Sequence, residues 1–188
     1  MRQYTLTLSY VLLITSLLNS EVYNGLILYS NSQGVGPSNT YIINNSYNNV
    51  NVWNHSIGAI GIPHLNPDRS IILQFRSDDH YFGNTHGPVG GILKKIDWNG
   101  NVIWNHSFFS DQFHPHHDIE VLPNGNILII AWEKKSYQDA ISVGRVDITN
   151  EMWPLVIYEI EPSGIADANV IWEWHLWDHL IQDIDSNL

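Results

Sequence analysis

The stretch GILKKIDWNGNVIWNHS, residues 91–107, predicts the fold of this chain. Two β-prone runs flank the turn DWNG, and the second run ends at Trp104. Asn, Asp and Gly are the residues that tight hairpin turns require. The same order of strand, turn, strand and tryptophan recurs around Trp53 and Trp172. We interpret these three stretches as an internal repeat.

A second hairpin follows each of the first two tryptophans. HLNPDRSIILQF from His64 matches EVLPNGNILIIA from Glu120, each as a strand, a turn led by proline and another strand. The second unit is longer between its tryptophan and its proline, and the excess falls at FFSDQFHPHHD. Four short strands per unit, at a period of about 50 to 70 residues, are typical of a β-propeller blade.

We therefore predict an all-β fold made of β-propeller blades. Residues 21–188 hold about two to three blades, whereas propellers close with about four to eight. We expect an incomplete propeller that is the N-terminal part of a longer protein. A β-sandwich built from the same hairpins is the alternative. The long connections at residues 76–91 and 133–145 are candidates for functional loops.

The composition excludes several classes of function. The chain has 188 residues, 8 basic and 19 acidic side chains and a net charge of −11, which argues against nucleic-acid binding through a basic surface. There is no cysteine, so disulfides, thiolate catalysis and cysteine-based zinc sites are excluded. Any anion site must be built locally from a few histidine or arginine side chains.

The first twenty residues predict a signal peptide. MRQYTLTLSYVLLITSLLNS has an early arginine, an apolar run and then small polar residues, with cleavage expected near Ser20. The domain would then span residues 21–188 of a secreted or periplasmic protein that has no membrane contact after cleavage. An uncleaved anchor and a plain first strand are the alternatives.

The segment FHPHHDIEVLPNGNILIIAWE, residues 113–133, contains the candidate functional residues. In a regular strand His114 and His116 would point one way, His117 the other, and Asp118 would share a face with His116. One interpretation is a histidine pair that lines a pocket, binds an anion and transfers a proton. A metal site completed by other residues and histidines that cap loop backbone are the alternatives.

A second histidine pair lies in WEWHLWDHL. His175 and His179 are four residues apart and could share a helical face. One reading is an aromatic core loop. The other is that Asp178 and His179 reach the pocket of the first segment.

These motifs together resemble the aryl-sulfate sulfotransferase (arylsulfotransferase) family. The resemblance rests on NGNVIW, then HHDIEVLPNGNILIIAWE, then YEIEP and NVIWEWHLWDHL, and is strongest from Gly91 to Leu180. It implies a six-bladed propeller with its active site at the central channel. It also implies transfer of a sulfo group from a phenolic sulfate donor to a phenol acceptor through a sulfated histidine, without a cofactor or a nucleotide donor.

The resemblance assigns roles to four residues. It makes His116 and His117 candidate catalytic residues, with His117 favoured, and Asp118 and His179 candidate substrate-binding residues. It assigns no metal ligand. The family's His-x-Asn segment, arginine strand and sulfated histidine come later in the chain, so we expect the nucleophile to be missing from this sequence. A non-catalytic propeller that binds an aromatic or sugar ligand and a histidine-based metal-binding domain are the other hypotheses.

Overall fold

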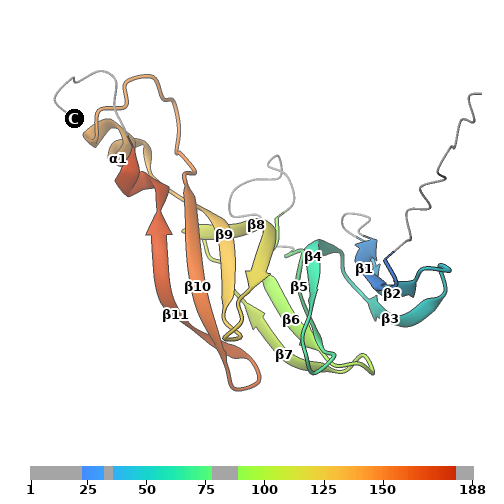
Figure 1. The fold of residues 1–188 in the computed structure, drawn as a ribbon. Helices are drawn as coiled ribbons and strands as arrows, with labels where there is room; N and C mark the ends of the chain where they lie inside the picture. The colour runs from blue at the N-terminus through green and yellow to red at the C-terminus, as the bar shows by residue number, and fades with distance from the viewer. Residues whose placement is uncertain (1–22, 32–35, 78–88, 181–188) are drawn as a thin grey trace, which may run out of the picture.

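Three antiparallel sheets make up the chain in the computed structural model, which describes residues 23–31, 36–77 and 89–180. The first sheet, blade 1, has the order β1-β2-β3, the second, blade 2, β4-β5-β6-β7, and the third, blade 3, β8-β9-β10-β11 (Figure 1). The strands are β1 Leu26–Asn31, β2 Ser38–Asn44, β3 Asn49–His55, β4 Ala59–Leu65, β5 Ile71–Phe75, β6 Ile92–Ile96, β7 Val102–Ser107, β8 Phe113–Val121, β9 Ile127–Glu133, β10 Leu155–Ser163 and β11 Asp167–His175.

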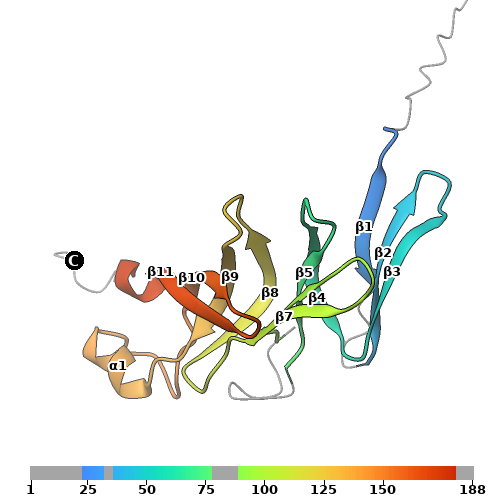
Figure 2. The ribbon, with the colours of Figure 1, turned by 90° about the horizontal axis from the view of Figure 1, so that it is seen from below.

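The sheets confirm the predicted all-β, propeller-like fold. Within each sheet, strands that follow one another in the chain pair in antiparallel order, and none of the three sheets closes on itself within the described residues. The sheets stand side by side like successive blades, and β1 contacts β4 while β4 contacts β8 (Figure 2). The first strand of each sheet thus lies beside the first strand of the next, which places β8 at the inner edge of blade 3.

The boundary between blades differs from the repeat read in the sequence. The tryptophan hairpin was expected to open each unit, but β7 with Trp104 is the last strand of blade 2 and β11 with Trp172 is the last strand of blade 3. The hairpin led by proline comes first in these two sheets. A linear repeat has no intrinsic starting point, so only the hydrogen bonds between strands could fix its phase.

Two apolar clusters join neighbouring blades. One packs Ile42 and Trp53 of blade 1 against Leu73 and Phe75 of blade 2. The other joins blades 2 and 3 through these buried residues: Ile72, Leu93, Trp104, Phe108, Ile119, Ile127, Ile129, Ala131, Val156, Tyr158 and Ile160. Burial of apolar area between blades is therefore the main source of cohesion in the array.

The tryptophans also fasten each blade to the next. The Trp53 indole N–H donates to the Asp97 carbonyl at 2.7 Å, and the Trp104 indole N–H donates to the Asp167 carbonyl at 2.9 Å. Both acceptors lie in the last hairpin of the following blade. The repeated tryptophan is thus a structural residue that combines a buried ring with a hydrogen bond across the blade interface.

The connections hold the helical structure of the described residues. α1, Tyr137–Ser142, lies in the loop predicted at residues 133–145, and a capping box between Ser136 and Asp139 starts it. η1, Leu176–His179, is a 3-10 turn after β11. No helix among the described residues has the length and apolarity needed to cross a membrane. The predicted signal peptide, residues 1–20, and most of the loop 76–91 lie outside the described residues.

Candidate functional site

The histidine segment forms a β-bulge in β8. Pro115 pairs with Ala131 and Ile119 pairs with Ile129, so three residues of β8 lie opposite the single residue Ile130. The bulge residues are His116, His117 and Asp118. His117 has φ +57, a left-handed conformation, so the regular alternation of faces expected from the sequence stops here.

Blade 2 has a bulge at nearly the same place in β4, with different side chains. Ile60 pairs with Gln74 and His64 with Ile72, so Gly61, Ile62 and Pro63 lie opposite Leu73, and Gly61 has φ +74. The turns after both strands have the same hydrogen bonds, Asn66 N to the Ser70 carbonyl and Leu122 N to the Asn126 carbonyl. Residues counted back from these turns correspond one to one, so Ile60-Gly61-Ile62 of blade 2 matches His116-His117-Asp118 of blade 3.

The two blades share this backbone arrangement but differ in the side chains at the three matching positions. At the three matching positions blade 2 has two isoleucines and the glycine that a left-handed position favours. Blade 3 has two histidines and an aspartate there, including a non-glycine residue at the strained position. Backbone strain of this kind concentrates at functional sites. The fold therefore accepts the polar triplet but does not require it.

His116 is the buried member of the pair. Its side chain is 5% exposed, and its ring packs on Trp132 with centroids 4.2 Å apart. Burial and then the neighbouring His117 lower the pKa of His116 to about 4, against a hydrogen bond with the Ala131 backbone that raises it, and His114 adds a smaller lowering. His116 is therefore neutral at pH 7.

The two bulge histidines share a hydrogen bond. Nδ1 of His116 lies 2.7 Å from Nδ1 of His117, so one nitrogen carries the proton and the other accepts it. Nε2 of His116 is buried and makes no hydrogen bond of normal geometry among the described residues, although a hydrogen bond with the Ala131 backbone raises the pKa of this ring. When His117 is the donor, the His116 proton sits on Nε2. The exposed His117 ring can exchange protons with solvent or substrate.

Asp118 links blade 3 to blade 2. Its Oδ1 accepts hydrogen bonds from the backbone N–H of Ile62 at 3.0 Å and of Ile119 at 2.9 Å. Gly61 packs so closely on this corner that a Cβ would lie 2.7 Å from the His117 carbonyl oxygen. The carboxylate thus holds the two bulges together, which is a positioning role for a residue that the sequence assigned to substrate binding.

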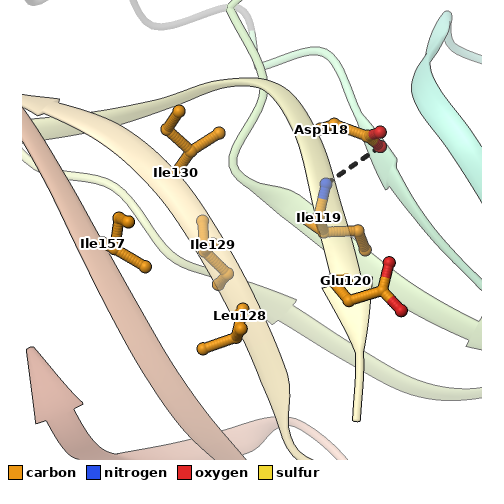
Figure 3. A pocket seen from close by; sticks show the side chains of 7 residues that line it. All are labelled: Asp118, Ile119, Glu120, Leu128, Ile129, Ile130 and Ile157. Carbon is orange, nitrogen blue, oxygen red and sulfur yellow. Dashed lines mark hydrogen bonds between the residues drawn. The ribbon is translucent and has the colours of Figure 1, made fainter.

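A shallow apolar groove begins at Asp118. It has a volume of about 280 Å³ and runs over the open face of blade 3 (Figure 3). Leu128, Ile130 and Ile157 line its apolar side, and Asp118 and Glu120 lie on the β8 side (Figure 3). Neither bulge histidine lines this groove.

His179 does not join this site. β8 and β11 are the opposite edges of blade 3, and His179 ends the 3-10 turn beyond β11, where its ring stacks on Trp174 with centroids 5.0 Å apart. The helical face predicted for His175 and His179 does not form, because His175 is the last residue of β11. In the described residues His179 thus lies apart from the bulge histidines, and its role in substrate binding stays a prediction.

His175 belongs to a separate ion cluster that the sequence did not indicate. Its Nδ1 lies 2.9 Å from Oε2 of the buried Glu133, and Lys135 Nζ lies 3.0 Å from the same oxygen. Within the described part of the chain, no group of three or more His, Asp or Glu side chains is arranged to hold a metal ion. The geometry thus gives the metal-binding hypothesis no support.

Two other histidines have structural roles. His114 is fully buried, and its Nε2 contacts Ser77 Oγ at 2.9 Å and the Gly90 carbonyl at 3.1 Å. His64 bonds to the Ile119 carbonyl at 2.8 Å and so adds to the contact between β4 and β8. His64 and Asn66 form a His-x-Asn sequence upstream of the bulge, but Asn66 bonds to Ser70 within its own turn.

Sequence reasoning missed the aromatic residues beside His116. Trp132 supports the histidine ring, and Trp153 lies 6.2 Å from Trp132 between ring centroids. Trp132 follows the recognised NGNILIIA run, but alternation alone did not show which face of β9 it occupies. Trp153 lies in a connection and has no periodic signal.

Comparison with known proteins identifies the family. The model of the family described as Arylsulfotransferase (ASST) matches residues 19–187. No curated protein matches the sequence. Since the family match covers nearly all of the chain, including the bulge of β8, the chain belongs to the arylsulfotransferase family.

Proposed function

We propose that this protein takes part in the transfer of a sulfo group from a phenolic sulfate to another phenol, with the sulfo group held at the bulge of β8. Family membership supports a sulfotransferase-type enzyme. The observation that carries the proposal is the bulge triplet His116-His117-Asp118, which occupies positions that blade 2 fills with Ile60-Gly61-Ile62.

The two histidines suit different parts of this chemistry. A sulfo group presents oxygens with partial negative charge, and donors fixed in position stabilise them as the S–O bond to the phenol breaks. The buried Nε2 of neutral His116 supplies such a donor in one tautomer of the pair. His117 is exposed and can pass a proton to the departing phenolate oxygen or take one from the incoming phenol.

The reaction balances as two displacements at sulfur. In the first, a histidine nitrogen forms a bond to sulfur while the S–O bond to the donor phenol breaks, and that oxygen gains a proton. In the second, the acceptor phenol loses its proton, its oxygen bonds to sulfur, and the S–N bond breaks. We assign binding and proton transfer to His116 and His117. We assign the nucleophilic histidine to no residue of this sequence.

The net charge makes local donors necessary. With a net charge of −11, the protein's overall field repels a sulfate ester. Asp118 adds a nearby negative charge, but its Oδ1 is occupied by two backbone N–H groups. Asp118 therefore acts in this proposal by fixing the bulge and not by contacting the sulfo group.

The test exchanges the bulge residues for their blade 2 counterparts. His116→Ile and His117→Gly introduce the residues that the matching positions of blade 2 already hold, so both variants should fold. We expect each to weaken binding of 4-nitrophenyl sulfate by about tenfold, in line with one lost hydrogen bond to a charged group. His106→Gln, on the outer strand β7, is the control.

Calorimetric titration and release of 4-nitrophenolate in the presence of phenol measure binding and transfer separately. Binding that depends on His116 supports the site even without transfer, because no residue of this sequence is assigned as the nucleophile. Wild-type affinity in both bulge variants would refute the assignment of the sulfo site.

A further inference from the structure

A pair of tryptophans extends away from the buried histidine. The Trp132 ring packs on His116 at 4.2 Å with an interplanar angle of 30°, and the Trp153 ring lies 6.2 Å from Trp132 at 41°. Both indoles are partly buried. Trp132 is on β9, and Trp153 immediately precedes the Pro154-Leu155 entry to β10.

A network of side chains fixes the outer tryptophan. The Trp153 indole N–H donates to Oε1 of Glu151 at 3.0 Å, and Oε2 of the same carboxylate receives Lys134 Nζ at 2.7 Å. The backbones of Lys135 and Met152 pair in an isolated bridge beside this network. The ring is thus held by contacts from both ends of the loop that carries α1.

The blade architecture does not require an indole at position 132. The correspondence between blades that matches Gly61 to His117 matches Arg76 of blade 2 to Trp132 of blade 3. A bulky aromatic ring therefore appears at this position in the same blade that carries the histidine bulge. Blade 3 thus differs from blade 2 both at His116 and at Trp132, and these two side chains are in contact.

We propose that Trp132 and Trp153 form an aryl-binding shelf that receives the aromatic ring of the sulfate ester. This inference rests on the proposed function, because it places the ring relative to a sulfo group at His116. In an aryl sulfate a single oxygen joins the sulfur to the ring, so a ligand whose sulfo group is at His116 must place its ring about one ring's width away. The shelf begins at the His116 ring, whose centroid lies 4.2 Å from that of Trp132, and indole faces stack well on phenyl rings.

Three probes separate the shelf from the sulfo site: 4-nitrophenyl sulfate, butyl sulfate and inorganic sulfate, each titrated calorimetrically at constant ionic strength. In Trp153→Leu we expect the affinity for 4-nitrophenyl sulfate to fall about three- to tenfold, the range of an aromatic pair. The affinities for butyl sulfate and inorganic sulfate should stay within twofold. Trp153→Tyr should restore most of the loss, because it restores an aromatic face.

The matched control is Trp172→Leu. Trp172 is 47% exposed on β11, at the opposite edge of blade 3 from the bulge, and its loss should change no affinity. This control accounts for a general effect of removing a tryptophan from blade 3.

The outcomes distinguish the two proposals. Unchanged binding of 4-nitrophenyl sulfate in Trp153→Leu, with binding of all probes still dependent on His116, overturns the shelf and leaves the sulfo site intact. Equal weakening of all three probes also overturns the shelf, because it shows that Trp153 acts only by supporting His116. Failure of the wild-type protein to bind any of the three probes refutes the sulfo site and the shelf together.

Discussion

His117 occupies a backbone position that disfavours its side chain. Its φ of +57 lies in the left-handed region, and the matching residue in blade 2 is Gly61 with φ +74. A residue with a Cβ in this region costs about 1 kcal/mol or more relative to an unstrained conformation. The protein retains this strain at the residue that our proposal uses for proton transfer.

Replacing His117 with glycine should therefore stabilise the fold. We expect His117→Gly to raise the free energy of unfolding by about 0.5–1 kcal/mol, because relief of strain outweighs the added freedom of the unfolded chain. Urea denaturation followed by tryptophan fluorescence measures this. The same variant should lose affinity for 4-nitrophenyl sulfate. A destabilised His117→Gly would show that the histidine contributes to folding and not to function.

The glycine at the matching position predicts the opposite response. Gly61→Ala should lower the free energy of unfolding by about 1–3 kcal/mol, since the new Cβ meets the His117 carbonyl and the Asp118 carboxylate at a positive φ. Parallel urea titrations compare the two variants. Equal stability of Gly61→Ala and wild type would mean that the two bulges do not pack as described.

Two buried histidines set a pH dependence of stability. The pKa of His55 is lowered to about 4 by burial and then by Lys94, and that of His116 to about 4 by burial and then by neighbouring histidines. The unfolded chain protonates both near pH 6.5 and the folded chain does not. Between pH 6.5 and pH 5 the unfolded state binds more protons, so stability falls as the pH falls.

The slope of the unfolding free energy against pH shows how many buried histidines contribute. We expect the free energy of unfolding to fall by up to about 1.4 kcal/mol per pH unit for each histidine in that range. His116→Ile should reduce the slope by about one proton. Urea titrations at several pH values, at fixed ionic strength, measure the slope. Stability that is constant from pH 7 to pH 5 would contradict the buried, neutral state of both side chains.

At the scale of the strand and hairpin, the alternation of apolar residues and the residue types of the turns predicted most of the strands. The hairpins around DWNG and PNGN, and the sheet strands that follow from them, form where the sequence predicts them. The bulges could not be predicted from the alternation of apolar residues, because extra residues in one strand do not change the apolar pattern of the partner strand. Only the strand register therefore shows on which face of β8 each histidine lies.

The repeated tryptophans make a second prediction at this scale. Trp104 is 5% exposed and bonds to the next blade, whereas Trp172 is 47% exposed. Trp104→Phe should lower the free energy of unfolding by about 1–2 kcal/mol through the lost hydrogen bond and the reduced packing. Trp172→Phe should change it by less than about 0.5 kcal/mol. Thermal and urea unfolding compare the variants, and equal effects would contradict the interface role of Trp104.

At the scale of the whole molecule, stability is expected to be graded across the blades. β5 is flanked by β4 and β6 and all five of its residues are buried, whereas β1 pairs with β2 alone in the described residues and exposes Leu26 and Ile27. Hydrogen exchange should therefore be slowest in β5 and β9 and fastest in β1 and β11. Comparable protection of β1 and β5 would show that a further chain covers the edge of β1.

The candidate site was predictable only in part. The segment with His116 and His117 could be selected from sequence because three histidines precede a recognisable hairpin. Contacts between separate strands, such as the packing of Trp132 on His116, depend on strand register and could not be predicted. The position of His179 relative to the bulge could not be predicted either, because the sequence does not show that β11 and β8 are opposite edges of one sheet.

The most direct test of the central claim is the affinity of the His116→Ile variant for 4-nitrophenyl sulfate, measured by calorimetry beside the wild-type protein and His106→Gln. The account predicts that wild type and His106→Gln bind with equal affinity and that His116→Ile binds about tenfold more weakly while remaining folded. Equal binding by all three proteins would show that the histidine bulge of β8 does not hold the sulfo group.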